Sequence, residues 1–102
     1  MDRIYPVKQE CPRNEVKALI DELLLRHEQH GRASSTRDFP TALRKDLTNS
    51  DYQFITAKTY AQLSRWCYPE RWSDREMYVR RIAMKLSEML FGEVIPRVQG
   101  SL

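Results

Sequence analysis

The sequence predicts an all-α fold, a small single-domain bundle of three main helices and one short helix. The chain has 102 residues, of which 41% are hydrophobic and 30% charged, a composition typical of a folded domain with one modest core. Only three residues are glycine, which is few for the many tight turns of a β-sandwich. Apolar residues recur in long segments at intervals of three and four, the period of an α-helix.

The first main helix is predicted at residues 13–30. Its apolar positions form one face, and Gly31 follows where the C-terminus of a helix favours a left-handed residue. Residues 1–12 contain Pro6 and Pro12 and show no periodicity, so they are predicted to form an extended N-terminal arm. The residues expected on the buried face of this helix are Val16, Leu19, Ile20, Leu23 and Leu24.

A short helix is predicted at residues 41–47, after a polar loop at residues 32–40. The second main helix is predicted at residues 51–66, because Ser50 and Gln53 have the spacing of a capping box. Residues 67–72, CYPERW, are predicted to form a turn, since Pro69 disfavours helical geometry at Tyr68. The residues expected to be buried in this second main helix are Tyr52, Ile55, Leu63 and Trp66.

The last main helix is predicted at residues 74–91. Ser73 and Glu76 have the spacing of a capping box before it, and Gly92 follows it. Residues 93–102 are expected to form a short C-terminal tail. The predicted organisation is therefore an arm at 1–12, a helical domain at 13–92 and a tail at 93–102. The apolar face of the last helix is expected to contain Val79, Ile82, Ala83, Leu86, Met89 and Leu90.

The cysteines and the apolar segments indicate a cytoplasmic protein. Cys11 and Cys67 are far apart in the sequence and form no CxxC pair. The first residues, MDRIYPVKQE, lack the apolar stretch of a signal peptide, and no apolar run approaches the roughly 18 residues that a membrane span requires. We therefore expect reduced cysteines, a cytoplasmic location and no membrane partner.

No residue pattern in the chain is typical of an enzyme. His27 and His30 lie three positions apart, but a structural zinc ion requires four ligands, and neither cysteine is spaced to complete the site. Cys67 has no histidine close in the sequence to act as its base. Glycine-rich phosphate-binding loops are absent from the sequence. We therefore expect no catalytic activity, no metal and no cofactor.

Aromatic residues are concentrated around the predicted turn, and arginines lie among them. Tyrosine, tryptophan and arginine dominate the binding energy of many protein–protein interfaces, because they combine a large contact area with a polar group. A short turn around a proline is expected to stay near the surface. The sequence therefore predicts a surface that binds a protein partner. Its predicted residues are Arg65, Tyr68, Pro69, Arg71, Trp72 and Arg75.

The segment RWCYPERW, together with the chain length and the helical pattern, resembles the small phage-encoded proteins that modify the host RecBCD nuclease. The resemblance covers this segment, residues 65–72, and the overall size, and it includes no diagnostic motif. It implies a non-enzymatic protein that docks on a bacterial nuclease–helicase. It also implies recruitment of a host prolyl isomerase at Pro69, because X–Pro bonds exchange slowly between cis and trans.

An alternative interpretation is a helix-turn-helix regulator that binds DNA. Ala42 would lie on the first helix of the unit, and residues 48–50 would form its turn. The net charge is +3, but the basic residues are spread along the chain, whereas strong phosphate binding requires them concentrated. The side chains expected to face the DNA are Gln53, Thr56, Lys58 and Thr59.

Overall fold

A computed structural model of the chain describes residues 4–29, 38–49, 53–70 and 72–97. The described residues form four helices and one small two-stranded sheet, which confirms the all-α class. The first helix and the last begin where the sequence predicts. The elements are β1 (Ile4–Pro6), α1 (Arg13–Gln29), α2 (Asp38–Asn49), β2 (Phe54–Thr56), α3 (Ala57–Cys67) and α4 (Asp74–Phe91).

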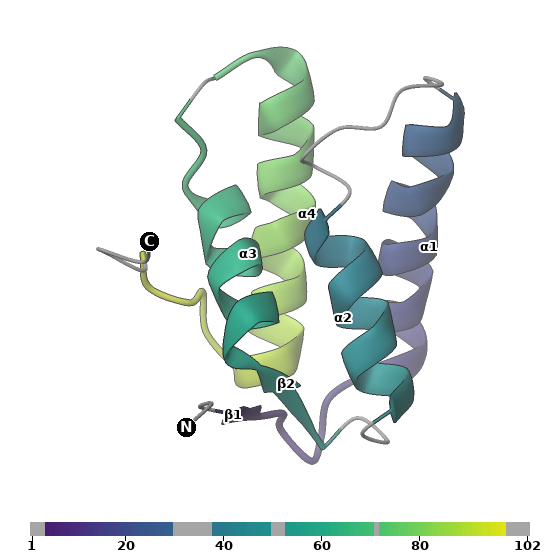
Figure 1. Ribbon diagram of the computed structural model, residues 1–102, viewed down its shortest axis with the longest axis vertical. Helices are drawn as coiled ribbons and strands as arrows, with labels where there is room; N and C mark the ends of the chain where they lie inside the picture. The colour runs from purple at the N-terminus through teal and green to yellow at the C-terminus, as the bar shows by residue number, and fades with distance from the viewer. Residues whose placement is uncertain (1–3, 30–37, 50–52, 71, 98–102) are drawn as a thin grey trace.

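The four helices form a bundle in which successive helices run in opposite directions (Figure 1). Each helix packs against two others: α1 contacts α2 and α4, and α3 contacts α2 and α4. This arrangement encloses one core to which every helix contributes, as short connections between antiparallel helices favour. Its fully buried side chains include Val16, Ile20, Leu23, Phe39, Leu43, Leu47, Leu63, Val79, Leu86 and Leu90.

The short helix is longer than the sequence predicts, and both of its predicted boundaries are wrong. We expected residues 41–47, but α2 extends over Asp38–Asn49. Pro40 lies in the first turn of α2, where a proline needs no hydrogen-bond donor and its fixed φ angle suits the helix. Phe39 and Pro40 are both buried. The helix therefore includes residues that the sequence assigned to the preceding loop.

The predicted start of the second main helix is also wrong. We expected a helix from residue 51, but residues 54–56 form β2, and α3 begins at Ala57. Thr56 caps α3: its hydroxyl accepts a hydrogen bond from the Thr59 amide. Ile55 is fully buried as expected, but on a strand rather than a helix. Ser50 and Tyr52 lie outside the described residues.

The sheet joins the N-terminal arm to the segment before α3. β1 and β2 are antiparallel, with Ile4 opposite Thr56 and Pro6 opposite Phe54. The ring of Tyr5 stacks on the ring of Tyr60 in α3, with centroids 3.7 Å apart. The arm continues into the core, where Val7 and Cys11 are buried. The arm is therefore extended at residues 4–6, but residues 9–10 form a turn in which the Cys11 amide donates a hydrogen bond of 3.1 Å to the Lys8 carbonyl, and the arm packs as part of the domain.

Residues 93–97 pack against α3 and α4. The Ile95 side chain is buried in the core. Ser64 Oγ donates a hydrogen bond of 2.7 Å to the Pro96 carbonyl, and Tyr68 Oη donates one of 3.0 Å to the Ile95 carbonyl. Ser87 Oγ accepts a hydrogen bond from the Ile95 amide at 3.1 Å. This part of the expected C-terminal tail is therefore a structured segment of the domain.

The two ends of α4 have the caps that the sequence indicates. Ser73 is the N-cap, and its hydroxyl accepts a hydrogen bond from the Glu76 amide. Gly92 has a φ angle of 85°, the left-handed conformation that glycine adopts without a steric penalty. Its amide donates a hydrogen bond of 2.7 Å to the Glu88 carbonyl. Both ends of α4 are therefore determined by local residues.

Candidate functional site

The α3–α4 turn spans residues 68–73, of which residues 68–70, 72 and 73 are described, and its beginning is anchored to the bundle by two hydrogen bonds. On one side, the Tyr68 hydroxyl reaches the Ile95 carbonyl in the C-terminal segment. On the other, Arg80 Nε of α4 donates a hydrogen bond of 3.1 Å to the Cys67 carbonyl, at the end of α3. Pro69, which directly follows these two residues, is buried. The turn is therefore held by side chains from two other parts of the chain.

Trp72 is an exposed aromatic residue of this turn. Its side chain is 61% exposed, the largest value among the large hydrophobic side chains of the described residues. The Arg80 guanidinium lies over the indole ring, 5.4 Å from its centroid. A cation over an aromatic face is attracted by the ring quadrupole. The same arginine therefore contacts the indole ring and fixes the end of α3.

The other residues predicted to bind a partner occupy different environments. Arg65 on α3 and Arg75 in the first turn of α4 are exposed, as the prediction requires. Tyr68 is half-buried and Pro69 is buried, which corrects the expectation that these two residues of the turn stay near the surface. Packing of the C-terminal segment against Tyr68 explains this burial. Arg71 lies outside the described residues.

Sequence reasoning missed the role of Arg80. Arg80 is not among the residues that the apolar periodicity of this helix singles out. Arg80 comes seven positions after Ser73, which is about two helical turns. The two residues therefore lie on the same side of α4. The spacing between Ser73 and Arg80 is visible in the sequence. The contacts of Arg80 with Cys67 and Trp72 depend on the tertiary structure.

The residues proposed for DNA recognition do not form a helix-turn-helix unit. Gln53 precedes β2, and Thr56 ends it, so neither lies on a second helix. Thr59 is only 2% exposed, a correction to the expectation that it faces outward. Thr59 is buried because α3 begins at Ala57, which turns this residue toward α2 and β2. Lys58 is exposed as expected.

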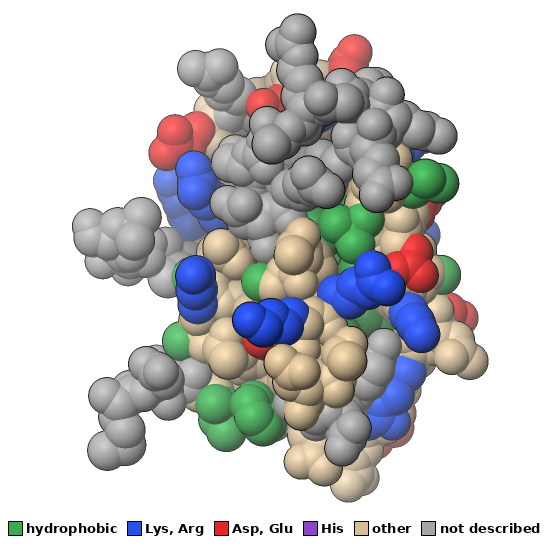
Figure 2. Space-filling view, turned by 45° about the vertical axis from the view of Figure 1, so that its right-hand side comes forward, with side chains coloured by type: hydrophobic (Ala, Val, Ile, Leu, Met, Phe, Trp, Pro, Cys, Tyr) green, Lys and Arg blue, Asp and Glu red, His purple; other side chains and the backbone are tan. Residues whose placement is uncertain are grey.

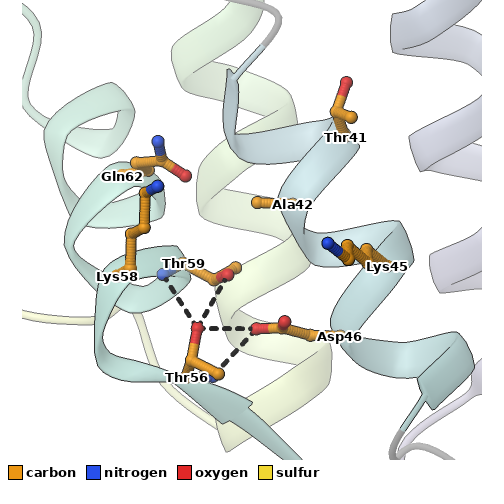
Figure 3. A pocket seen from close by; sticks show the side chains of 8 residues that line it. All are labelled: Thr41, Ala42, Lys45, Asp46, Thr56, Lys58, Thr59 and Gln62. Atoms are coloured by element: carbon orange, nitrogen blue, oxygen red, sulfur yellow. Dashed lines mark hydrogen bonds between the residues drawn. The ribbon is translucent and has the colours of Figure 1, made fainter. Parts of the chain in front are cut away.

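A pocket of about 550 Å³ lies between α2 and α3. Lys45 and Lys58 lie on opposite walls of this pocket, one on each helix (Figure 3). Lys and Arg side chains also cross the middle of the molecular face drawn in Figure 2. We name this cavity the α2–α3 pocket. Its lining residues are Thr41, Ala42, Lys45, Asp46, Thr56, Lys58, Thr59 and Gln62.

The two cysteines are free thiols, and both are buried. Burial raises the pKa of Cys67 to about 11, although a hydrogen bond from Ser87 and the charge of Arg80 act in the opposite direction. A thiol with a raised pKa is a poor nucleophile, because the thiolate is the reactive form. Cys67 therefore packs as a small apolar side chain.

Within the described residues, no three His, Cys, Asp or Glu side chains gather as a metal site. The side chain of His27 and all of His30 lie outside the described residues. Among the helices that the structure describes, none combines the length and apolar character needed to cross a membrane.

Comparison of the chain with known protein families, with curated proteins and with solved structures finds no match.

Proposed function

We propose that the chain is a non-enzymatic binding protein that docks on a protein partner through the α3–α4 turn and alters the partner's activity. The exposed indole of Trp72 is the observation that carries this proposal. Tryptophan is the residue most enriched among interface hot spots, since a large ring can fill a pocket on the partner. Arg65 and Arg75 are exposed near the two ends of the turn and supply charged groups around this anchor.

The anchoring of the turn supports the same proposal. Binding costs free energy when a flexible loop must be ordered, so a turn already held in place binds more tightly for the same contacts. The contacts of Tyr68 with Ile95 and of Arg80 with Cys67 hold the two residues that precede Pro69, and the N-cap at Ser73 holds the residue that follows Trp72. Trp72 is thus presented next to a fixed backbone, with Arg80 against its ring.

The resemblance of residues 65–72 to phage-encoded modifiers of the RecBCD nuclease makes a bacterial nuclease–helicase the first partner to test. The free thiols of Cys11 and Cys67 support a cytoplasmic location, where such a partner works. Burial of Pro69 does not support the expected contact with a prolyl isomerase, because the ring is not accessible. We therefore assign binding to Trp72 and the exposed arginines.

The test is a binding titration of the chain against the purified nuclease–helicase, with nuclease and helicase rates measured in parallel. We expect the wild-type chain to bind and to change at least one rate. Trp72→Ala should weaken binding by about 30-fold or more, the loss of roughly 2 kcal/mol typical of a hot spot. Arg75→Ala should weaken binding less.

Leu25→Ala is the matched control, because Leu25 is 55% exposed on α1, away from the turn. It should bind as the wild type does. If Trp72→Ala binds as tightly as the wild type, the docking surface does not include the turn. A pull-down from a bacterial lysate, with and without nuclease treatment, then separates a protein partner from one held through nucleic acid.

A further inference from the structure

The α2–α3 pocket is formed by two helix faces that point toward each other. Thr41 and Lys45 lie four residues apart on α2, and Lys58 and Gln62 lie four apart on α3, so each pair shares one helix face. Figure 3 shows these side chains on the two walls of the pocket. The volume of about 550 Å³ lies within the range of small-ligand sites, roughly 300–1,000 Å³. The cavity is therefore large enough for an organic ligand.

The charged groups that line the pocket favour an anion. Lys45 and Lys58 are its two cationic side chains, and both are exposed to solvent at the pocket walls. Asp46 is the only carboxylate in the lining. It is engaged with Thr56, accepting hydrogen bonds from the backbone amide at 2.8 Å and from the hydroxyl at 3.0 Å. The lining therefore carries a net positive charge.

The uncharged side chains of the lining leave room beside the lysines. Thr41 and Ala42 lie on the α2 wall and Gln62 on the α3 wall. The Gln62 Oε1 atom is covered by protein atoms, so a ligand in the pocket does not reach it. Ala42 has a small, half-buried side chain that leaves the space open. The pocket is thus suited to a ligand in which an anionic group is attached to a larger uncharged part.

We propose that the α2–α3 pocket binds the phosphate group of a nucleotide, with Lys45 and Lys58 contacting phosphate oxygens and the sugar or base lying against Thr41 and Ala42. Phosphate oxygens accept charge-assisted hydrogen bonds from lysine. The nucleotide is either free or part of a single strand, since the same group is present in both. The site shares no residue with the α3–α4 turn, so it does not depend on the docking function proposed for Trp72.

The test is a titration of the isotopically labelled full-length chain with adenosine monophosphate, followed by backbone amide shifts at constant ionic strength. We expect shifts at Lys45 and at the first turn of α3. Lys45→Gln should weaken binding by about tenfold, as loss of a charged hydrogen-bond donor does. Ala42→Leu should abolish binding by filling the pocket without changing its charge. Lys85→Gln on α4 removes the same charge outside the pocket and should bind as the wild type does.

A second titration with a single-stranded oligonucleotide identifies the source of the phosphate. If a strand is the ligand, it binds more tightly than the mononucleotide, and Lys45→Gln lowers the slope of log K against log salt by about one. Binding of the mononucleotide alone assigns the site to free nucleotides. The proposal is wrong if neither ligand shifts the pocket amides, or if Lys85→Gln weakens binding as much as Lys45→Gln.

Discussion

The two tryptophans lie near each other in the sequence, one in the last turn of α3 and one after it, but their environments are opposite. Trp66 lies in the last turn of α3 and is 8% exposed, whereas Trp72 in the following turn is 61% exposed. The hydrophobic free energy of a side chain depends on the apolar area that folding removes from water. Trp66 is therefore expected to stabilise the fold, and Trp72 to remain available for a partner.

Substitution of each tryptophan by alanine should separate these roles. Trp66→Ala leaves a cavity and should lower the free energy of unfolding by about 3–5 kcal/mol. Trp72→Ala loses mainly the contact with Arg80 and should cost about 1 kcal/mol or less. Urea unfolding of both variants measures the difference. An equal loss of stability would show that the turn, like Trp66, is a structural element and that the partner binds elsewhere.

The raised pKa of Cys67 predicts that the protein loses stability at alkaline pH. That pKa is raised from 9.0 to about 11 in the folded chain, chiefly by burial. Between pH 9 and 11, the folded state thus keeps the thiol proton that the unfolded state loses. The contribution of Cys67 to the free energy of unfolding is therefore complete below pH 9 and is lost as the pH rises to 11. It corresponds to roughly 2–3 kcal/mol.

Urea unfolding at several pH values between 8 and 11 measures this effect. Cys67→Ala should be less stable at pH 8, but its stability should fall less steeply above pH 9. Cys11, Tyr60 and Tyr78 also have raised pKa values, chiefly through burial, so a residual slope is expected in the variant. Identical slopes in the wild type and the variant would contradict the assignment to Cys67.

At the scale of single elements, α3 depends on Thr56. Its hydroxyl accepts a hydrogen bond from the Thr59 amide and also lies 3.0 Å from Asp46 Oδ2 of α2. One side chain therefore caps α3 and connects it to the neighbouring helix. The N-cap of α4, Ser73, is exposed and caps only its own helix.

Thr56→Ala should therefore destabilise the fold by about 1–2 kcal/mol, and Ser73→Ala by about 1 kcal/mol or less, within the range of lost N-caps. The connection between α2 and α3 is measured by a double-mutant cycle of Thr56→Ala with Asp46→Ala. We expect a coupling of at least about 0.5 kcal/mol, because the two side chains are in direct contact. Additive effects would mean that Asp46 acts only through the Thr56 backbone amide.

At the scale of the whole molecule, the two ends of the described chain complete the core. Val7 and Cys11 enter it from the arm, and Ile95 enters it from the C-terminal segment. The Lys8 amide donates a hydrogen bond of 2.8 Å to the Leu90 carbonyl, which connects the arm to the end of α4. Helices α1 to α4 therefore do not form a complete core without these segments.

Ile95→Ala should lower the free energy of unfolding by about 2–5 kcal/mol, as other large-to-small core substitutions do. Arg97→Ala, two residues further along and exposed, is the control and should change stability by less than about 0.5 kcal/mol. Thermal and urea unfolding measure both. If Ile95→Ala is as stable as the control, the C-terminal segment does not contribute to the core.

The sequence alone was sufficient for α1 and α4. Their apolar periodicity and the caps at Ser73 and Gly92 are local signals, and both helices begin where those signals predict. The exposure of Trp72 was also predicted, from its position in a short turn. These features depend on residues within a few positions of each other, so one sequence contains the whole signal.

Only the tertiary structure decided β2, the start of α3, the burial of Pro69 and the α2–α3 pocket. β2 forms by pairing with β1, about fifty residues earlier in the chain, and Tyr68 is half-buried against a segment that follows α4. Lys45 and Lys58 meet across a pocket because two helices pack together. The sequence therefore determined the helical class and the local caps of this protein. The candidate sites depend on contacts between distant segments, and such contacts leave no periodic pattern in a single sequence.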